Sequence, residues 1–105
     1  MKNLTDLMKQ AQALQSKMGD MQAELEALEV EGTSGGGLVR VTMSGKGAVK
    51  KVSIAPDLMK EDEREILEDL IAAASADAKA KSERLAEEKM KSIAGGLPLP
   101  PGFSL

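Results

Sequence analysis

The sequence predicts an α+β fold in which a long helix, a three-stranded antiparallel sheet and a second long helix follow one another. Three observations predict this order. Apolar residues near the start of the chain recur at alternating intervals of three and four. The middle of the chain alternates apolar and polar residues, and the second half returns to helix-forming residues with an apolar stripe. At 105 residues the chain corresponds to one domain or less.

The first predicted helix covers residues 4–28, with Asn3 as its N-cap and Asp6 near the positive end of the helix dipole. A helix of about 26 residues is roughly 39 Å long, whereas a compact domain of this size has a radius of gyration of about 13 Å. We therefore expect this helix to protrude and to need a long partner helix. Its seam consists of Leu4, Leu7, Ala11, Leu14, Met18, Met21, Leu25 and Leu28.

The first two strands are expected on either side of a glycine-rich loop. Residues 29–31 suggest a short strand, and residues 32–37 (Gly-Thr-Ser-Gly-Gly-Gly) suggest a flexible loop. The spacing of Gly32 and Gly37 resembles a phosphate-binding loop, but Leu38 and Val39 stand where such a loop needs Lys and Ser or Thr. Residues 38–44 alternate as a strand does, with Val39, Val41 and Met43 on one face.

A hairpin turn at residues 45–47 (Gly-Lys-Gly) leads to a third strand at residues 48–55. Val52 and Ile54 share a face, but Val49 breaks the two-residue period, which suggests a β-bulge near residues 50–51. An aromatic-free core in a small, elongated chain favours oligomerisation. We expect the sheet to form a homodimer interface through Val39, Val41, Met43, Val52 and Ile54.

The second helix is expected to begin near residues 60–62 and to stop at Gly95-Gly96. Residues 97–105 contain three prolines and are expected to form an extended tail of polyproline type. The predicted organisation is therefore one domain over residues 1–96 followed by a Pro-rich tail at 97–105.

Charge is segregated along the chain, although the net charge is only −3. Residues 20–31 and 57–69 are acidic, whereas residues 1–18 and 79–91 carry an excess of lysine and arginine. Helix one ends at the sheet and helix two begins there, so the far ends of both helices should point away from the sheet on the same side. A dimer would then resemble a clamp with basic tips.

Most chemistry is disfavoured by the composition. The chain has no cysteine and no histidine, so it lacks soft and imidazole metal ligands, a thiol nucleophile and a base to activate serine. We expect no enzyme activity, no cofactor, no metal and no small-molecule substrate. No apolar run is long enough to cross a membrane and no secretion signal is evident, so a soluble cytoplasmic protein is expected.

Basic helix tips can bind duplex DNA through its phosphates, whereas the absence of tryptophan and tyrosine argues against stacking on single strands. Exposed lysines on helices also commonly form only local ion pairs. The candidate DNA-binding residues are Lys2, Lys9, Lys17, Lys79, Lys81, Arg84, Lys89 and Lys91. The alternative is a dimeric protein-interaction or chaperone-like accessory factor of replication or recombination, supported by the Met-rich seam and the tail.

Several segments in the same order resemble the YbaB/EbfC family of nucleoid-associated proteins. They are residues 1–12, the strand around Gly37-Leu38-Val39, the Gly45–Gly47 turn, Ile54-x-Pro56-Asp57, residues 67–78 and Pro100-Pro101-Gly102. The resemblance covers nearly the whole chain. It implies a bacterial, tweezer-like homodimer that binds double-stranded DNA with weak sequence specificity, in the cytoplasm at the nucleoid, where it organises DNA and regulates genes.

Overall fold

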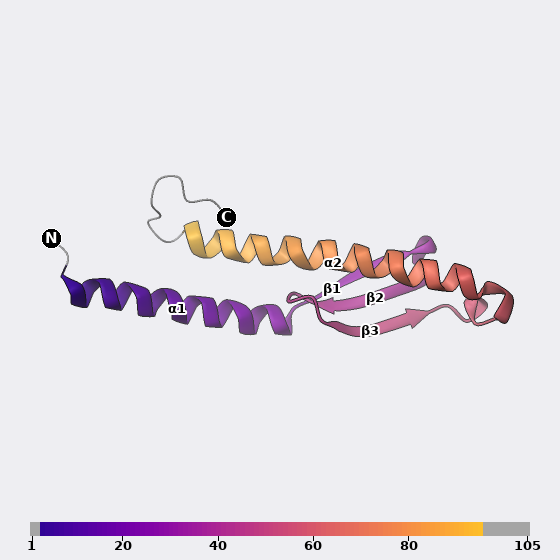
Figure 1. Cartoon of the computed structure of the whole chain (residues 1–105), viewed down its shortest axis with the longest axis horizontal. Coiled ribbons are helices and arrows are strands. Elements are labelled where there is room, and N and C mark those ends of the chain that lie inside the picture. Colours follow the sequence, from indigo (N-terminus) through magenta and orange to yellow (C-terminus); the bar gives the residue numbers. More distant parts are fainter. Residues whose placement is uncertain (1–2, 96–105) are drawn as a thin grey trace.

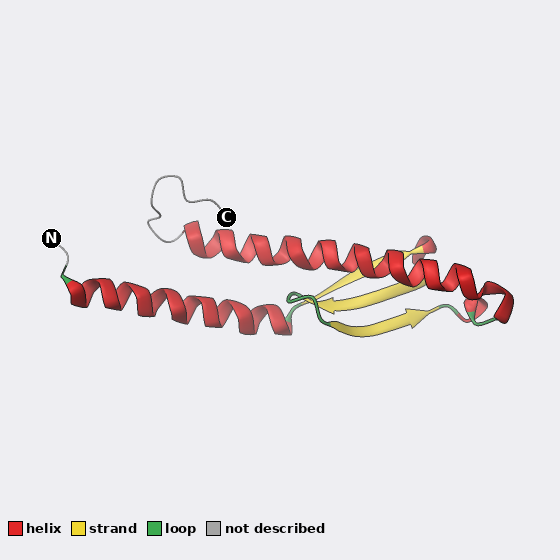
Figure 2. Cartoon of the chain, in the orientation of Figure 1, coloured by secondary structure: helices red, strands yellow, loops and turns green. Residues whose placement is uncertain are grey.

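The computed structural model describes residues 3–95 and shows an elongated molecule of 71 × 25 × 16 Å (Figure 1). A long helix, a three-stranded antiparallel sheet and a second long helix follow one another, as predicted (Figure 2). The elements are α1 (Leu4–Ala27), β1 (Glu29–Ser34), β2 (Val39–Ser44), β3 (Val49–Ile54) and α2 (Arg64–Gly95), with 3₁₀ turns at Gly35–Gly37, Pro56–Leu58 and Glu61–Glu63. The expected tail at 97–105 lies outside the described residues.

Helix α1 begins where its cap predicts and protrudes from the sheet. The Asn3 side-chain oxygen accepts a hydrogen bond from the backbone N–H of Asp6 at 2.9 Å, which satisfies one free donor of the first turn. Near the other end of the helix Met21 and Leu25 are buried. The radius of gyration of 19.7 Å exceeds the roughly 13 Å of a compact domain of this length.

The sheet has the order β1-β2-β3, and its register shows the predicted bulge. Thr42 pairs with Lys51, but the next residue of β2, Met43, pairs with Val49. Lys50 is therefore the extra residue, and its insertion returns Val49 to the same face of the sheet as Val52. The break in alternation is explained by this bulge.

The expected glycine-rich loop is shorter than predicted because residues 32–34 belong to β1. Gly32 pairs with Val41 and lies directly beneath α2. A Cβ atom at Gly32 would overlap the backbone of Ala74 and Ala78, both fully buried. The glycine thus permits a close approach of strand and helix rather than flexibility. Only Gly35–Gly37, all with positive φ, form the turn.

Helix α2 packs on β1 and β2, and this contact corrects part of the predicted dimer interface. Val39 and Val41 are fully buried and Met43 is 4% exposed within a single chain, so they form its core and leave no surface for a partner. Strand β3 lies beyond the edge of α2. There Val52 is 43% exposed and Val49 is 57% exposed.

The face of the sheet opposite α2 is polar. Arg40 and Glu31 lie on neighbouring strands there, and their side chains form an ion pair at 3.6 Å. Lys51 and Ser53 of β3 are exposed. The uncovered apolar surface of the sheet is thus confined to β3, on the side that α2 occupies.

We expect Gly32→Ala to lower the free energy of unfolding by about 3 kcal/mol, because the added methyl group forces α2 away from β1. Gly19→Ala is the matched control, since a Cβ at Gly19 meets nothing within 4 Å. This control should be neutral or should stabilise the helix by up to about 1 kcal/mol. Urea denaturation followed by circular dichroism measures both changes. Equal stability of the two variants would contradict the close packing.

Candidate nucleic-acid interface

The far ends of α1 and α2 lie at the same end of the molecule, away from the sheet (Figure 1). This agrees with the arrangement expected from the connectivity. The segment 79–91 does not lie wholly at that end, however. Lys79 lines a cleft beside the hairpin turn, and the Nζ atom of Lys81 donates a hydrogen bond to the backbone oxygen of Glu31 in β1 at 2.8 Å.

Lys81 is held in the body of the molecule by a polar cluster rather than presented at a tip. Asp77 accepts a hydrogen bond from the backbone N–H of Thr33 at 3.0 Å and pairs with Lys81 at 3.1 Å. The Thr33 N–H, followed by Lys81 and Arg84, lowers the pKa of the Asp77 carboxyl group because these groups stabilise its ionised form. This cluster connects α2 to β1.

Lys17 and Lys89 are brought together between the two helices. They line a cleft of about 190 Å³ together with Met21 and Ile93. The Lys89 ammonium group forms an ion pair with Glu24 at 2.6 Å, and the two side chains are 32% and 49% exposed. Lys89 therefore links α2 to α1, and part of its charge is already compensated.

The other predicted cations are more available, and among them Lys79 and Arg84 are exposed on the part of α2 nearer the sheet. Lys9, Lys17 and Lys91 are exposed, and none of them forms an ion pair with another described residue. Lys2 lies outside the described residues. Lys9 lies on the part of α1 that extends furthest from the sheet, and Lys91 lies in the last turns of α2 (Figure 1).

The hairpin turn and the start of β3 supply two cations, Lys46 and Lys50, that the sequence did not single out as charged contacts. Lys46 lies 3.8 Å from Glu26, and Lys50 donates to the backbone oxygen of Glu26 at 2.8 Å. Each therefore holds the sheet to the end of α1. These contacts form because the end of α1 lies beside the hairpin turn. The alternation of residues in the strands does not predict that position.

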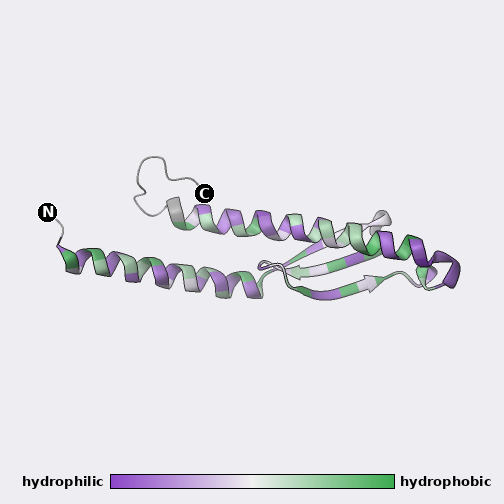
Figure 3. Cartoon of the chain, viewed as in Figure 1, coloured by the Kyte–Doolittle hydropathy of each residue, from purple (hydrophilic) through white to green (hydrophobic). Residues whose placement is uncertain are grey.

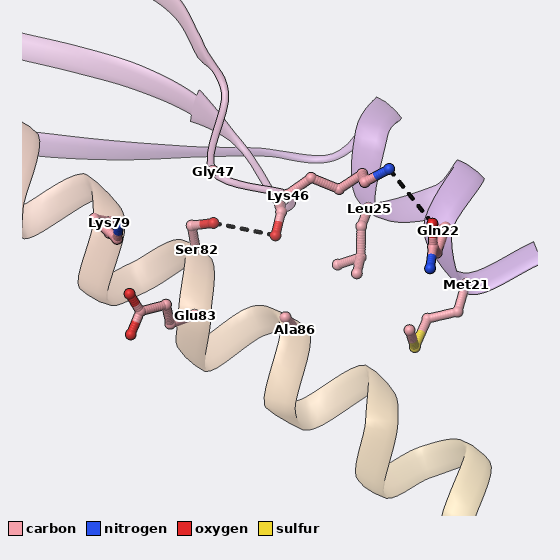
Figure 4. A pocket seen from close by; sticks show the side chains of 10 residues that line it. Met21, Gln22, Leu25, Lys46, Gly47, Lys79, Ser82, Glu83 and Ala86 are labelled. Carbon is pink, nitrogen blue, oxygen red and sulfur yellow. Dashed lines mark hydrogen bonds between the residues drawn. The ribbon is translucent and has the colours of Figure 1, made fainter. Parts of the chain in front are cut away.

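A cleft of about 340 Å³ lies where the hairpin turn meets both helices (Figure 4). Its walls include the apolar side chains of Met21, Leu25 and Ala86. The hydroxyl group of Ser82 donates to the backbone oxygen of Gly45 at 3.1 Å across it. The cleft lies where the arms meet the sheet, and the one hydroxyl group in its lining, that of Ser82, is bonded to the Gly45 backbone.

Within residues 3–95 no group of three acidic side chains is arranged to hold a metal ion. Among the described helices, none is long and apolar enough to cross a membrane.

Comparison with known proteins connects this architecture to a family. Residues 1–97 match the YbaB/EbfC DNA-binding family. A nucleoid-associated protein of Methylocella silvestris is 57% identical over 105 residues, which is the whole of this chain and 98% of the relative. One of Rhodopseudomonas palustris is 58% identical over the whole chain and 99% of the relative. The crystal structure of an uncharacterized Helicobacter pylori protein shares the fold, with a TM-score of 0.71, 19% identity and coverage of 91% and 97% of the two chains.

We expect Asp77→Asn to lower the Tm at neutral pH, because it removes the charge that pairs with Lys81. The pKa of Asp77 is lowered by folding, so its stabilising effect is present above the unfolded pKa of about 3.9 and is lost as the pH falls through the folded pKa. The Tm difference from the parent chain should therefore shrink in acid. Asp69→Asn, an exposed carboxylate on the same helix without a hydrogen bond to another described residue, is the control. A difference that is constant down to pH 2 would contradict this account.

Proposed function

Because the chain belongs to the YbaB/EbfC DNA-binding family, we propose that it is a nucleoid-associated protein that binds duplex DNA as a homodimer through its helical arms. The observation that carries the proposal is the pair of protruding helices, α1 and the outer part of α2, with exposed lysines at one end of the molecule. The proposal places the protein in the bacterial cytoplasm at the nucleoid. It involves no catalysis, no cofactor and no small-molecule substrate.

The contacts proposed for DNA are to its phosphates. Lys9, Lys17 and Lys91 are flexible point charges on helix surfaces, and such groups neutralise phosphates without distinguishing bases. Lys89 is paired with Glu24, and Lys81 is engaged by Asp77 and by the backbone of Glu31. Lys79 and Arg84 are exposed but lie nearer the sheet than Lys91 does, so we assign these four residues a smaller share. Specificity for sequence should be weak, because base recognition needs a set of side chains placed in a groove.

The proposed dimer uses the side of β3 that α2 leaves uncovered. Val49, Val52 and Ile54 face this side, and β3 is an edge strand of the sheet. Exposed apolar side chains on one face of a strand form a patch that a second copy of the chain can cover. A two-fold axis running along the arms would place both pairs of helices on one side, which gives the tweezer-like shape.

We expect Lys17→Glu/Lys91→Glu to weaken DNA binding at least tenfold while the fold is retained. Each lost phosphate contact should also reduce the slope of log Kd against log salt by about 0.9. The control is Lys51→Glu/Lys60→Glu, which changes the net charge equally at exposed sites away from the arms. Fluorescence anisotropy with two duplexes of unrelated sequence, measured over a range of salt concentrations, gives both quantities. Equal losses in the two double variants would show that the arms are not the contact surface.

We expect the parent chain to have a mass of about twice 11.1 kDa in solution, and Val52→Glu to reduce it to that of one chain. A buried glutamate at the centre of the proposed interface would lose its hydration without a partner. Ser53→Glu, on the other face of β3, should remain dimeric. Light scattering coupled to gel filtration distinguishes these states. A parent chain of single mass would reject the dimer, and an unaffected Val52→Glu dimer would place the interface elsewhere.

A further inference from the structure

The apolar seam of α1 is covered over only half of its length. Towards the sheet Met21 is 8% exposed and Leu25 is 4% exposed, since both face α2 and the hairpin turn. Towards the N-terminus Leu4 is 72% exposed, Leu7 is 53% exposed and Leu14 is 42% exposed. Figure 3 shows apolar positions recurring along this outer part of α1.

The change occurs where α2 ends. Ile93 of α2 lines a cleft with Lys17 and Met21 of α1, so the two helices face each other up to about Lys17. Helix α2 ends at Gly95, and α1 continues past it toward Leu4 without a partner among the described residues (Figure 1). The chain thus leaves α2 at the point where the uncovered stretch of the seam begins.

We propose that residues 97–105 of the same chain cover the outer seam of α1, continuing the stripe that α2 covers as far as Ile93. These nine residues include no charged side chain, and among them are Leu97, Leu99, Leu105 and Phe103, the only aromatic residue of the protein. An uncharged, apolar segment is chemically matched to the row of Leu4, Leu7 and Leu14.

The segment is long enough to reach. At about 3.1 Å per residue in a polyproline conformation, nine residues extend roughly 28 Å. The stretch of seam from Met18 to Leu4 rises about 21 Å at 1.5 Å per residue. Pro98, Pro100 and Pro101 limit the conformations of the unbound segment, so less entropy is lost when it is ordered on the helix.

A second copy of α1 fits the outer seam less well. The exposed positions between Leu4 and Met18 span two heptads, whereas a self-sufficient coiled coil generally needs three or four. The segment 97–105 is joined covalently to α2, whose last described turn lies near the seam. Its effective concentration there is high, on the order of millimolar for a short connection, so a small apolar contact is sufficient.

Hydrogen–deuterium exchange of the parent chain and of a chain ending at Gly96 tests the contact. We expect the amides of residues 8–17 to exchange several-fold faster in the shortened chain, because the outer half of α1 loses the apolar cover that the proposal assigns to residues 97–105. Amides of β2 should be unchanged, which shows that the sheet remains folded. Unchanged exchange in α1 would overturn the proposal.

Cross-linking identifies which chain supplies the segment. Because the chain has no native cysteine, only the introduced cysteines can form a disulfide. We expect Ala11→Cys/Ser104→Cys to form a disulfide within one chain. Ser16→Cys/Ser104→Cys, about 140° around α1 from the seam, should form it much more slowly. Equal rates for the two pairs, or a disulfide only between chains, would overturn the proposal. DNA binding enters neither measurement, so the outcome is separate from that of the proposed function.

Discussion

The contact between Gly32 of β1 and the small residues of α2 determines the shape of this molecule. With no side chain at Gly32, the strand backbone lies directly against Ala74 and Ala78. Val39, Val41 and Met43 of β2 complete the core beneath the same helix. A core without aromatic residues gains little area per side chain, so close backbone approach compensates by bringing more atoms into contact. The orientation of α2 over the sheet, and therefore the direction of its free end, follows from this packing.

The hairpin turn fixes the position of α1 relative to α2. The backbone N–H of Gly45 donates to the oxygen of Leu25 at 2.8 Å, and the backbone oxygen of Gly45 accepts from Ser82 at 3.1 Å. One residue of the turn therefore contacts both helices. A Cβ at Gly45 would lie 2.8 Å from the Leu25 side chain, so a larger residue would push α1 away. Beyond this junction the arms are connected by the Lys89–Glu24 ion pair.

Much of the fold could be predicted from local patterns, and the errors have a common physical origin. The heptad seam located α1, the alternation located β2, and the broken parity at Val49 located the bulge. Gly32 was wrongly predicted to lie in a loop. It is needed in β1 because Ala74 and Ala78, more than forty residues away in the sequence, pack against its backbone. The sequence identified the apolar face of the sheet. It could not show which residues of that face α2 covers, because this depends on how the helix packs on the sheet. Lys81 was assigned to a tip for the same reason: its position relative to the sheet depends on where α2 crosses β1.

The distribution of charge along the molecule is compatible with the proposed DNA contact at one end, although the net charge of the chain is −3. The acidic residues of 57–69 lie in the turns before α2 and in its first turns, at the opposite end of the long axis from the free ends of both helices (Figure 1). The long axis measures 71 Å, whereas charges in physiological salt are screened over about 8 Å. The acidic end therefore cannot cancel the local field of Lys9, Lys17 and Lys91.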